Sequence, residues 1–248
     1  MLKFIRTVCL LLFNLQLLLA QPVEVYFEQG NRAYSEGKYQ DAADLYHKII
    51  EKGVASGEVY FNLGNTYYKL DQIGKTILYY EKAQQYLEGD PALEQNMKLA
   101  SLKVVDKIEP IPKLFLEEWW NAVTHIFPLT IIAWLSYILF FLIMIFAAFY
   151  LLFPKKIFIR AIWIFVTLFV IALSFYLSRI YQFESSKYGV ILASKVSVVS
   201  EPSLTGSEVF IIHEGTKVAI NREIDGWFEI SLADGKTGWL KTNDLELI

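Results

Sequence analysis

The stretch VYFNLGNTYYKLDQIGKTILYYEKA, residues 59–83, closely follows the pattern of VYFEQGNRAYSEGKYQDAADLYHKI, residues 25–49. The identical pairs, each 34 positions apart, include Tyr26 and Tyr60, Gly30 and Gly64, Asn31 and Asn65, Tyr34 and Tyr68, and Tyr46 and Tyr80. A repeat of this period, combined with helical spacing of the apolar residues, indicates a solenoid of helical hairpins. The turns inside the hairpins are expected at Gly37-Lys38 and Asp71-Gln72.

The repeated glycine indicates close packing between helices. Glycine inside a helix is about 1 kcal/mol less favourable than alanine, so its recurrence suggests that a neighbouring helix needs the space. We therefore predict that Gly30 and Gly64 are packing residues.

These residues resemble the tetratricopeptide repeats, which implies an α-solenoid over residues 21–110 with about two repeats and a capping helix. The sequence departs from the family pattern at Gln29 and Thr76, and by about three extra residues before Asp90-Pro91. With that insertion, the capping helix would pack through Met97, Ala100, Ser101 and Val104. The proline-containing stretch IEPIP, residues 108–112, would end it.

The resemblance also implies a concave groove that binds an extended segment of a partner protein. Its expected lining comprises Phe27, Asn31, Tyr34, Phe61, Asn65, Tyr68, Lys69 and Lys98. In peptide-binding members of the family, asparagines at such places bind the main chain or the terminal carboxylate of the peptide. The alternative is that these asparagines have no ligand and that Tyr34 and Tyr68 only pack. A specific carboxylate clamp is disfavoured, because Phe27 and Phe61 occupy clamp positions.

Three apolar stretches explain why 54% of the 248 residues are hydrophobic. Residues 1–20 read as a signal peptide, which contains the single cysteine, Cys9. Residues 126–154 and 161–181 are each long enough to cross a bilayer. They follow a linker at 111–125, in which Trp119 and Trp120 suit the headgroup level, and they flank a short basic loop at 155–160.

The charges predict the orientation of this hairpin. Lys155, Lys156 and Arg160 favour a cytoplasmic loop, and the signal peptide independently sends the mature N-terminus across the membrane. We therefore expect a two-pass membrane protein with both soluble segments in one extracytoplasmic space.

The C-terminal segment, residues 188–248, reads as a small all-β domain. It contains five or six short runs of β-branched and aromatic residues, and Asp234-Gly235 is a strong hairpin signal. The spacing of EGTKV (214–218), DGWFEI (225–230) and DGKTGWL (234–240) resembles bacterial SH3-like barrels. Trp227 and Trp239 are its markers, as core residues or, alternatively, as a ligand-facing surface.

No signal for catalysis or for a cofactor appears. His47, His125 and His213 show no triad spacing, and metal-protease, phosphate-binding and dinucleotide motifs are lacking. The net charge of −3 disfavours nucleic acid as a partner. We expect a protein that is not an enzyme and that binds no metal.

The order of signal peptide, tetratricopeptide repeats, membrane hairpin and SH3-like domain resembles the BatE-type proteins of aerotolerance (Bat) operons. The resemblance implies a multidomain adaptor of a bacterial inner membrane, with both soluble segments in the periplasm. Its expected partners are membrane proteins with von Willebrand A-type domains, a MoxR-type ATPase and other Bat components, with a role in oxygen tolerance or envelope stress. The alternative is a membrane protein that binds peptidoglycan through its SH3-like domain.

Overall fold

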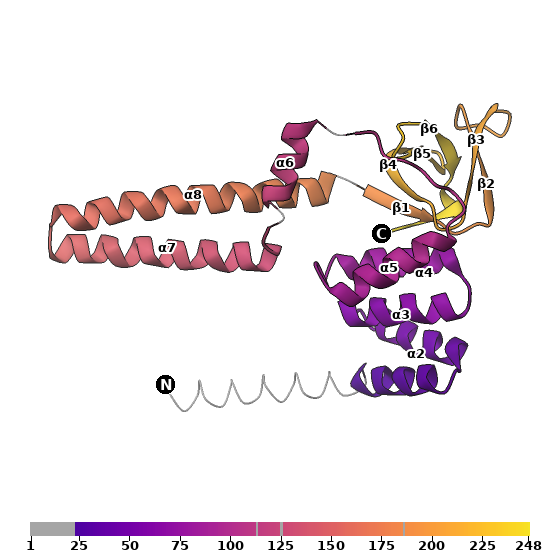
Figure 1. Cartoon of the computed structure of the whole chain (residues 1–248), viewed down its shortest axis with the longest axis horizontal. Coiled ribbons are helices and arrows are strands. Elements are labelled where there is room, and N and C mark those ends of the chain that lie inside the picture. Colours follow the sequence, from indigo (N-terminus) through magenta and orange to yellow (C-terminus); the bar gives the residue numbers. More distant parts are fainter. Residues whose placement is uncertain (1–22, 113, 125, 186) are drawn as a thin grey trace. The chain divides into compact units, whose positions relative to one another are not determined.

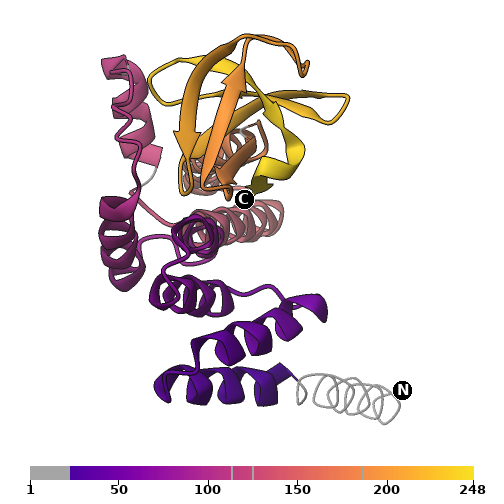
Figure 2. The same ribbon diagram turned by 90° about the vertical axis from the view of Figure 1, so that its right-hand side faces the viewer.

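The computed structural model describes residues 23–248 except 113, 125 and 186. The predicted signal peptide at 1–20, with Cys9, and His125 lie outside the described residues. The N-terminal part contains a helix over residues 23–35, α2 (Tyr39–Glu51), α3 (Gly57–Lys69), α4 (Ile73–Gln84) and α5 (Pro91–Lys103). Figures 1 and 2 show these helices stacked in chain order.

The two hairpin turns lie where the sequence predicts them. Gly37 and Asp71 each adopt a left-handed backbone conformation, with φ of 76° and 56°. The bonds around them also repeat, because the amide of Lys38 donates to the Ala33 carbonyl and the amide of Gln72 to that of Tyr67. The first four helices therefore form two hairpins of equal design.

The alignment of α5 with the two preceding repeats differs from the predicted one. Helix α3 begins at Gly57 and α5 at Pro91, so the spacing of 34 continues and the expected insertion of three residues is wrong. The reason is the cap: the Asp90 carboxylate accepts from the amides of Ala92 and Leu93, which fixes Pro91 as the first helical residue.

The shifted register changes the packing face predicted for α5. Leu93 and Ala100 are buried, and Met97 and Val104 pack half-buried against the helical core, whereas Ser101 is exposed. Helix α5 ends at Lys103, before the proline-containing stretch, as predicted.

A single apolar core runs through the helices. Its larger members are Tyr46, Ile49, Leu63, Leu78, Tyr79, Tyr80 and Leu93. The core also includes Val190 of the C-terminal sheet, with Leu192 and Ile248 packed against it. The helices and the sheet therefore share buried apolar surface.

Two long helices, α7 (Leu129–Leu152) and α8 (Lys156–Ser185), are apolar enough to span a membrane over 24 and 26 residues, the second span being Lys156–Tyr181. Helix α8 begins earlier than expected, so Lys156 and Arg160 lie in its first turns and the loop is shorter than 155–160. The predicted linker at 111–125 contains a helix, α6 (Phe115–Thr124).

The C-terminal segment forms an antiparallel seven-stranded sheet, where five or six strands were expected. The strands are β1 (Lys187–Ile191), β2 (Lys195–Val199), β3 (Glu208–His213), β4 (Lys217–Ile224), β5 (Trp227–Ser231), β6 (Thr237–Lys241) and β7 (Leu245–Leu247), with a 3₁₀ turn at Thr242–Asp244. Their order is β3-β2-β6-β5-β4-β1-β7, which is open at β3 and β7. The predicted hairpin at Asp234-Gly235 joins β5 to β6, with Gly235 at φ 84°.

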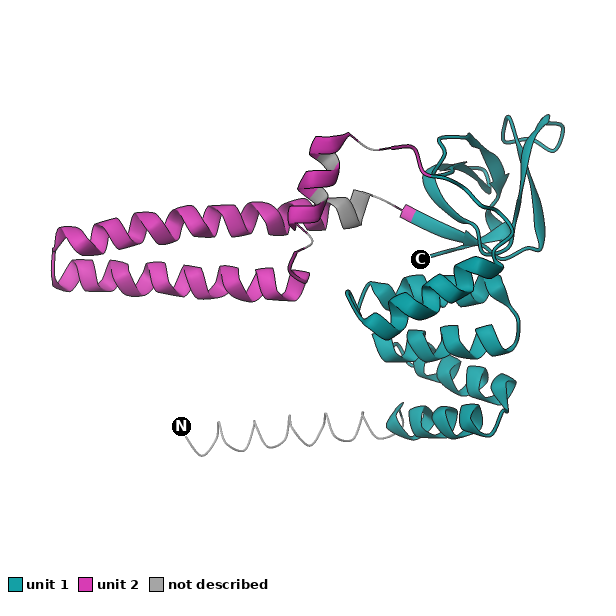
Figure 3. Cartoon of the chain, in the orientation of Figure 1, with its two compact units in different colours: residues 1–109, 188–248 teal, residues 110–187 magenta. Residues whose placement is uncertain are grey.

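The chain divides into two compact units (Figure 3). One contains the helices up to Glu109 together with the sheet from Tyr188 onward, and the other contains residues 110–187. The repeats and the sheet thus belong to one unit, although α6, α7 and α8 separate them in the sequence.

Candidate protein-binding surfaces

Each repeated glycine makes room for a tyrosine ring from the following helix. A Cβ added at Gly30 would lie 2.6 Å from a ring carbon of Tyr46, and one at Gly64 would overlap the ring of Tyr80 in the same way. Both tyrosines are almost fully buried. The packing role predicted for Gly30 and Gly64 is confirmed, and the same contact recurs 34 residues later.

Each repeated asparagine joins three helices. The Tyr46 hydroxyl donates to Asn31 Oδ1 at 2.7 Å, and Asn62 Nδ2 of α3 donates to the same oxygen at 3.1 Å. One repeat later, Asn65 Oδ1 accepts from the Tyr80 hydroxyl at 2.7 Å and from Asn96 Nδ2 of α5 at 2.8 Å. We call these two sets, Asn31–Tyr46–Asn62 and Asn65–Tyr80–Asn96, the asparagine networks.

The asparagine networks determine what the two carboxamides can offer to a ligand. A carboxamide oxygen has two lone pairs, and both are used by the donors from tyrosine and asparagine. Burial raises the pKa of Tyr46 to about 12, and burial also raises the pKa of Tyr80, so both hydroxyls stay protonated at ordinary pH. Among the described residues, Asn31 Nδ2 and Asn65 Nδ2 have no hydrogen-bond partner, so each retains N–H donors.

The other residues predicted for the groove lie beside these asparagines. Phe27 and Phe61 are half-buried, with ring centroids 6.1 and 6.0 Å from those of Tyr46 and Tyr80. Tyr34 is half-buried with its centroid 5.3 Å from that of Tyr39. We call the surface formed by Phe27, Asn31, Tyr34, Phe61, Asn65 and Tyr68 the asparagine face.

Positive charge lies at the α5 end of the asparagine face. Lys103 Nζ lies 4.6 Å from the ring centroid of Tyr68 and also pairs with Asp71 at 2.6 Å. Lys69 is exposed. Sequence reasoning missed Lys103, because the predicted insertion hid that Lys103 is the counterpart of Lys69, 34 positions earlier.

Lys98 does not occupy the groove position predicted for it. With the spacing of 34 preserved, Lys98 corresponds to Gly64, and its side chain is exposed. The counterparts of Asn65 and Tyr68 are Leu99 and Leu102, and both are exposed. Asn62 and Asn96, also 34 apart, could have revealed this register in the sequence.

The two marker tryptophans of the sheet differ in exposure. Trp239 in β6 is only 6% exposed, and the Arg222 guanidinium lies 5.0 Å from its ring centroid. Arg222 is itself held by two hydrogen bonds to Glu229. Trp227, at the start of β5, is half-buried. Trp239 is therefore a buried residue covered by Arg222, not a ligand-facing ring.

The side chain of Asp106, in the segment after α5, forms hydrogen bonds with the sheet. Its carboxylate accepts from the His213 amide at 2.6 Å and from the Thr216 hydroxyl at 2.6 Å, and it lies 2.9 Å from His213 Nδ1. Burial opposes the charged form, but the hydrogen bonds from Thr216 and His213 outweigh it and lower the pKa of Asp106.

Further contacts join α4 to the sheet around this carboxylate. Lys217 pairs with Glu81 at 2.6 Å, and Lys82 pairs with Glu246 at 2.7 Å. Gly215, with φ of 83°, lies against Ile73, Ile77 and Val104, where a side chain would crowd them. We call this set of contacts, with Asp106, the helix–sheet junction.

The helix–sheet junction should weaken in acid. Because the pKa of Asp106 is lower in the folded chain, its contribution is present above its unfolded value of about 4 and is lost as the pH falls through the folded value. We expect Asp106→Asn to lower stability near neutral pH by about 1–2 kcal/mol. Melting temperatures measured from pH 7 downward should converge for the two proteins in acid, whereas Glu201→Gln, on an exposed loop, should follow wild type throughout. A constant difference between Asp106→Asn and wild type would contradict this role.

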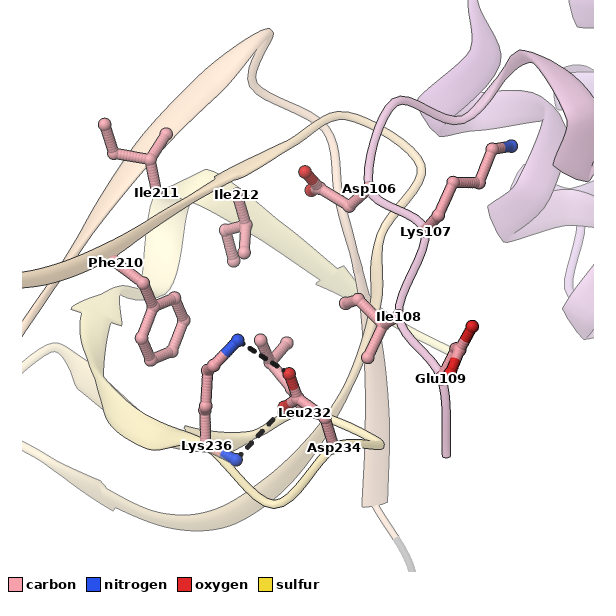
Figure 4. Close-up of a pocket in the computed structure, with 10 residues that line it drawn as sticks. All are labelled: Asp106, Lys107, Ile108, Glu109, Phe210, Ile211, Ile212, Leu232, Asp234 and Lys236. Atoms are coloured by element: carbon pink, nitrogen blue, oxygen red, sulfur yellow. Dashed lines mark hydrogen bonds and ion pairs between the residues drawn. The ribbon is translucent and has the colours of Figure 1, made fainter. Parts of the chain in front are cut away.

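A shallow pocket of about 340 Å³ lies beside the helix–sheet junction (Figure 4). Residues 106–109 form one wall, and Phe210, Ile212 and Leu232 line the sheet side. Ile108 packs against the core of the sheet, and Asp234 pairs with Lys236 at its edge. The segment after α5 thus lies against the sheet.

The sequence matches no protein-family model, and no curated protein is significantly similar to it.

The two described histidines make structural contacts. His47 Nε2 lies 2.7 Å from the Tyr67 hydroxyl, and burial, together with the nearby charge of Lys75, lowers the pKa of His47. His213 belongs to the helix–sheet junction. Within the described part of the chain, no group of three or more histidine, cysteine or acidic residues could hold a metal ion.

Proposed function

We propose that this protein is a two-pass membrane adaptor that binds an extended segment of a partner protein on its asparagine face. The observation that carries the proposal is the duplication of the asparagine network, which leaves two equivalent pairs of N–H donors one repeat apart. Half-buried Phe27 and Phe61 beside the donors offer apolar contact to the same segment.

The two carboxamides can act only as hydrogen-bond donors, and this limits the groups that a ligand can present to them. Since both oxygens are occupied, Asn31 and Asn65 can only donate, and the matching groups on a ligand are main-chain carbonyls or a carboxylate. An extended chain presents carbonyls at regular intervals and has its acceptors free, unlike a helix or a paired strand.

The contacts of the helix–sheet junction support a topology in which both soluble segments lie on the same side of the membrane. A junction between α4, the Asp106 segment and the sheet requires one compartment for both. An even number of spans, α7 and α8, meets that requirement. The basic residues at 155–160 support a cytoplasmic loop and hence a periplasmic location for both segments.

The proposal includes the family resemblances. The paired hairpins with a spacing of 34 support tetratricopeptide repeats, and the antiparallel sheet, in which β4, β5 and β6 pair in chain order, supports an SH3-like domain. By resemblance to BatE-type proteins, the partners would be membrane proteins with von Willebrand A-type domains and other Bat components. A peptidoglycan-binding role has less support, because Trp239 is buried.

Substitution by aspartate tests the asparagine face with little change to the fold. Asn31→Asp with Asn65→Asp keeps an oxygen for each tyrosine hydroxyl but removes the N–H donors. At about 0.5–1.5 kcal/mol for each hydrogen bond, co-purification of a von Willebrand A-type membrane protein should fall roughly tenfold or more. The protein is tagged, extracted in detergent, and its partners are quantified by mass spectrometry.

The matched control is Tyr46→Phe with Tyr80→Phe, which breaks the same networks and leaves the donors in place. This control should melt at a lower temperature and still recover the partner. Equal loss of partner in both variants would mean that the networks act only on stability. Unchanged recovery in the aspartate variant would reject the asparagine face as the binding site, and binding of the purified protein to cell-wall sacculi would favour the peptidoglycan alternative.

A further inference from the structure

We propose that α6 is an interfacial helix whose apolar face lies in the headgroup region of the lipid bilayer. The proposal rests on the membrane placement of α7 and α8 in the proposed function. It assigns a lipid-binding surface to a segment that the sequence alone marks as a linker with two tryptophans.

The sequence of α6, FLEEWWNAVT, separates apolar from polar residues around the helix axis. At 100° per residue, the apolar residues occupy one continuous arc and the polar ones the opposite arc. The apolar arc consists of Phe115, Leu116, Trp119, Trp120, Ala122 and Val123.

Contacts with α8 hold α6 at the end of a candidate span. Trp120 Nε1 donates to Ser178 Oγ at 3.1 Å, and the Trp120 ring meets Phe175 edge-on at a centroid distance of 5.4 Å. Arg179 donates to the carbonyl of Thr124 at 3.1 Å. Because the span of α8 ends at Tyr181, these contacts place the α6 helix level with the membrane boundary.

The large side chains of the apolar arc other than Trp120 are exposed within this unit. Phe115 is 76% exposed, Leu116 74% and Trp119 53%. Trp120, bound to α8, and Val123 are half-buried. Three large apolar side chains thus adjoin α7 and α8, whose own apolar side chains are also largely exposed.

The bilayer is the occupant that these observations favour. The exposed arc is continuous with helices suited to lipid, and tryptophan prefers the headgroup level. The sequence of α6 contains no lysine or arginine, so its binding needs apolar insertion and not attraction to anionic lipids. Neutral phosphatidylcholine should therefore suffice.

Spin-label accessibility tests this placement on the full chain in phosphatidylcholine nanodiscs. In a Cys9→Ser background, single labels are placed at Phe115→Cys, Leu116→Cys and Trp119→Cys on the apolar arc. Glu118→Cys reports the polar arc, and Phe141→Cys reports an exposed site on α7. Collisions with oxygen, which concentrates in lipid, are compared with collisions with a water-soluble nickel chelate.

We expect oxygen collisions to dominate at the three apolar positions and at Phe141, with the ratio inverted at Glu118. Nickel collisions dominating at all four α6 positions, with Phe141 still in lipid, would overturn the interfacial helix and leave the proposed function standing. Nickel collisions at Phe141 as well would overturn both. Protection of the apolar arc from both probes would mean that protein, and not lipid, covers it, and would also reject the proposal.

Discussion

Trp239→Ala will destabilise the unit formed by the repeat helices and the sheet by about 3–5 kcal/mol, the usual cost of truncating a buried tryptophan. The ring lies in β6, which is hydrogen-bonded to β5 and β2, and only 6% of it is exposed. Its removal takes away buried apolar surface and the ring on which the Arg222 guanidinium lies. Urea midpoints from pulse proteolysis of the detergent-solubilised chain give the change in unfolding free energy.

Arg222→Ala is the matched control for Trp239. It uncovers the ring without creating a void, and an exposed cation–π contact is worth only about 0.5–1 kcal/mol. If Trp239→Ala unfolds at the wild-type urea concentration, Trp239 is not a structural residue and a ligand-binding role for it returns.

Gly64→Ala will destabilise the helical part by about 1–3 kcal/mol, the range for overpacking a tightly packed site. Alanine favours a helix over glycine by about 1 kcal/mol, so this loss opposes the intrinsic preference. The cause is the overlap of the new methyl group with the ring of Tyr80, which is almost fully buried and cannot move away freely. Gly30→Ala should behave in the same way against Tyr46.

A double-mutant cycle separates the overlap from other effects of Gly64→Ala. In a Tyr80→Ala background the ring is absent, so Gly64→Ala should become neutral or stabilising. The same loss in both backgrounds would show that the glycine is needed for its backbone and not for the ring. A stabilised Gly64→Ala chain would contradict the close packing altogether.

The repeats could be predicted from the sequence because identical residues perform identical local tasks. Gly30 and Gly64 face tyrosine rings, and the two turns sit at Gly37 and Asp71. The register of α5 was missed because its counterparts to Gly64 and Asn65 are Lys98 and Leu99, which are exposed and do not repeat the glycine and the asparagine.

The internal role of the asparagines could not be predicted from spacing alone. Asn31 and Asn65 were expected to bind the main chain or the terminal carboxylate of a ligand, but their oxygens accept hydrogen bonds from buried tyrosine hydroxyls. The spacing of 15 residues between each asparagine and its tyrosine becomes meaningful only once the hairpin brings them together. Contacts across the helix–sheet junction, more than 100 residues apart in the case of Asp106 and His213, were equally hidden.

Thiol labelling of intact cells tests most directly the central claim that both soluble segments lie together outside the cytoplasm. In a Cys9→Ser background, Glu36→Cys reports the repeats, Leu204→Cys the sheet and Lys155→Cys the loop, all at exposed positions. With the outer membrane permeabilised, a membrane-impermeant maleimide should label Glu36→Cys and Leu204→Cys, and should reach Lys155→Cys only after lysis. Labelling of Lys155→Cys alone would contradict the orientation, and labelling of only one soluble segment would contradict the single unit that the helix–sheet junction holds together.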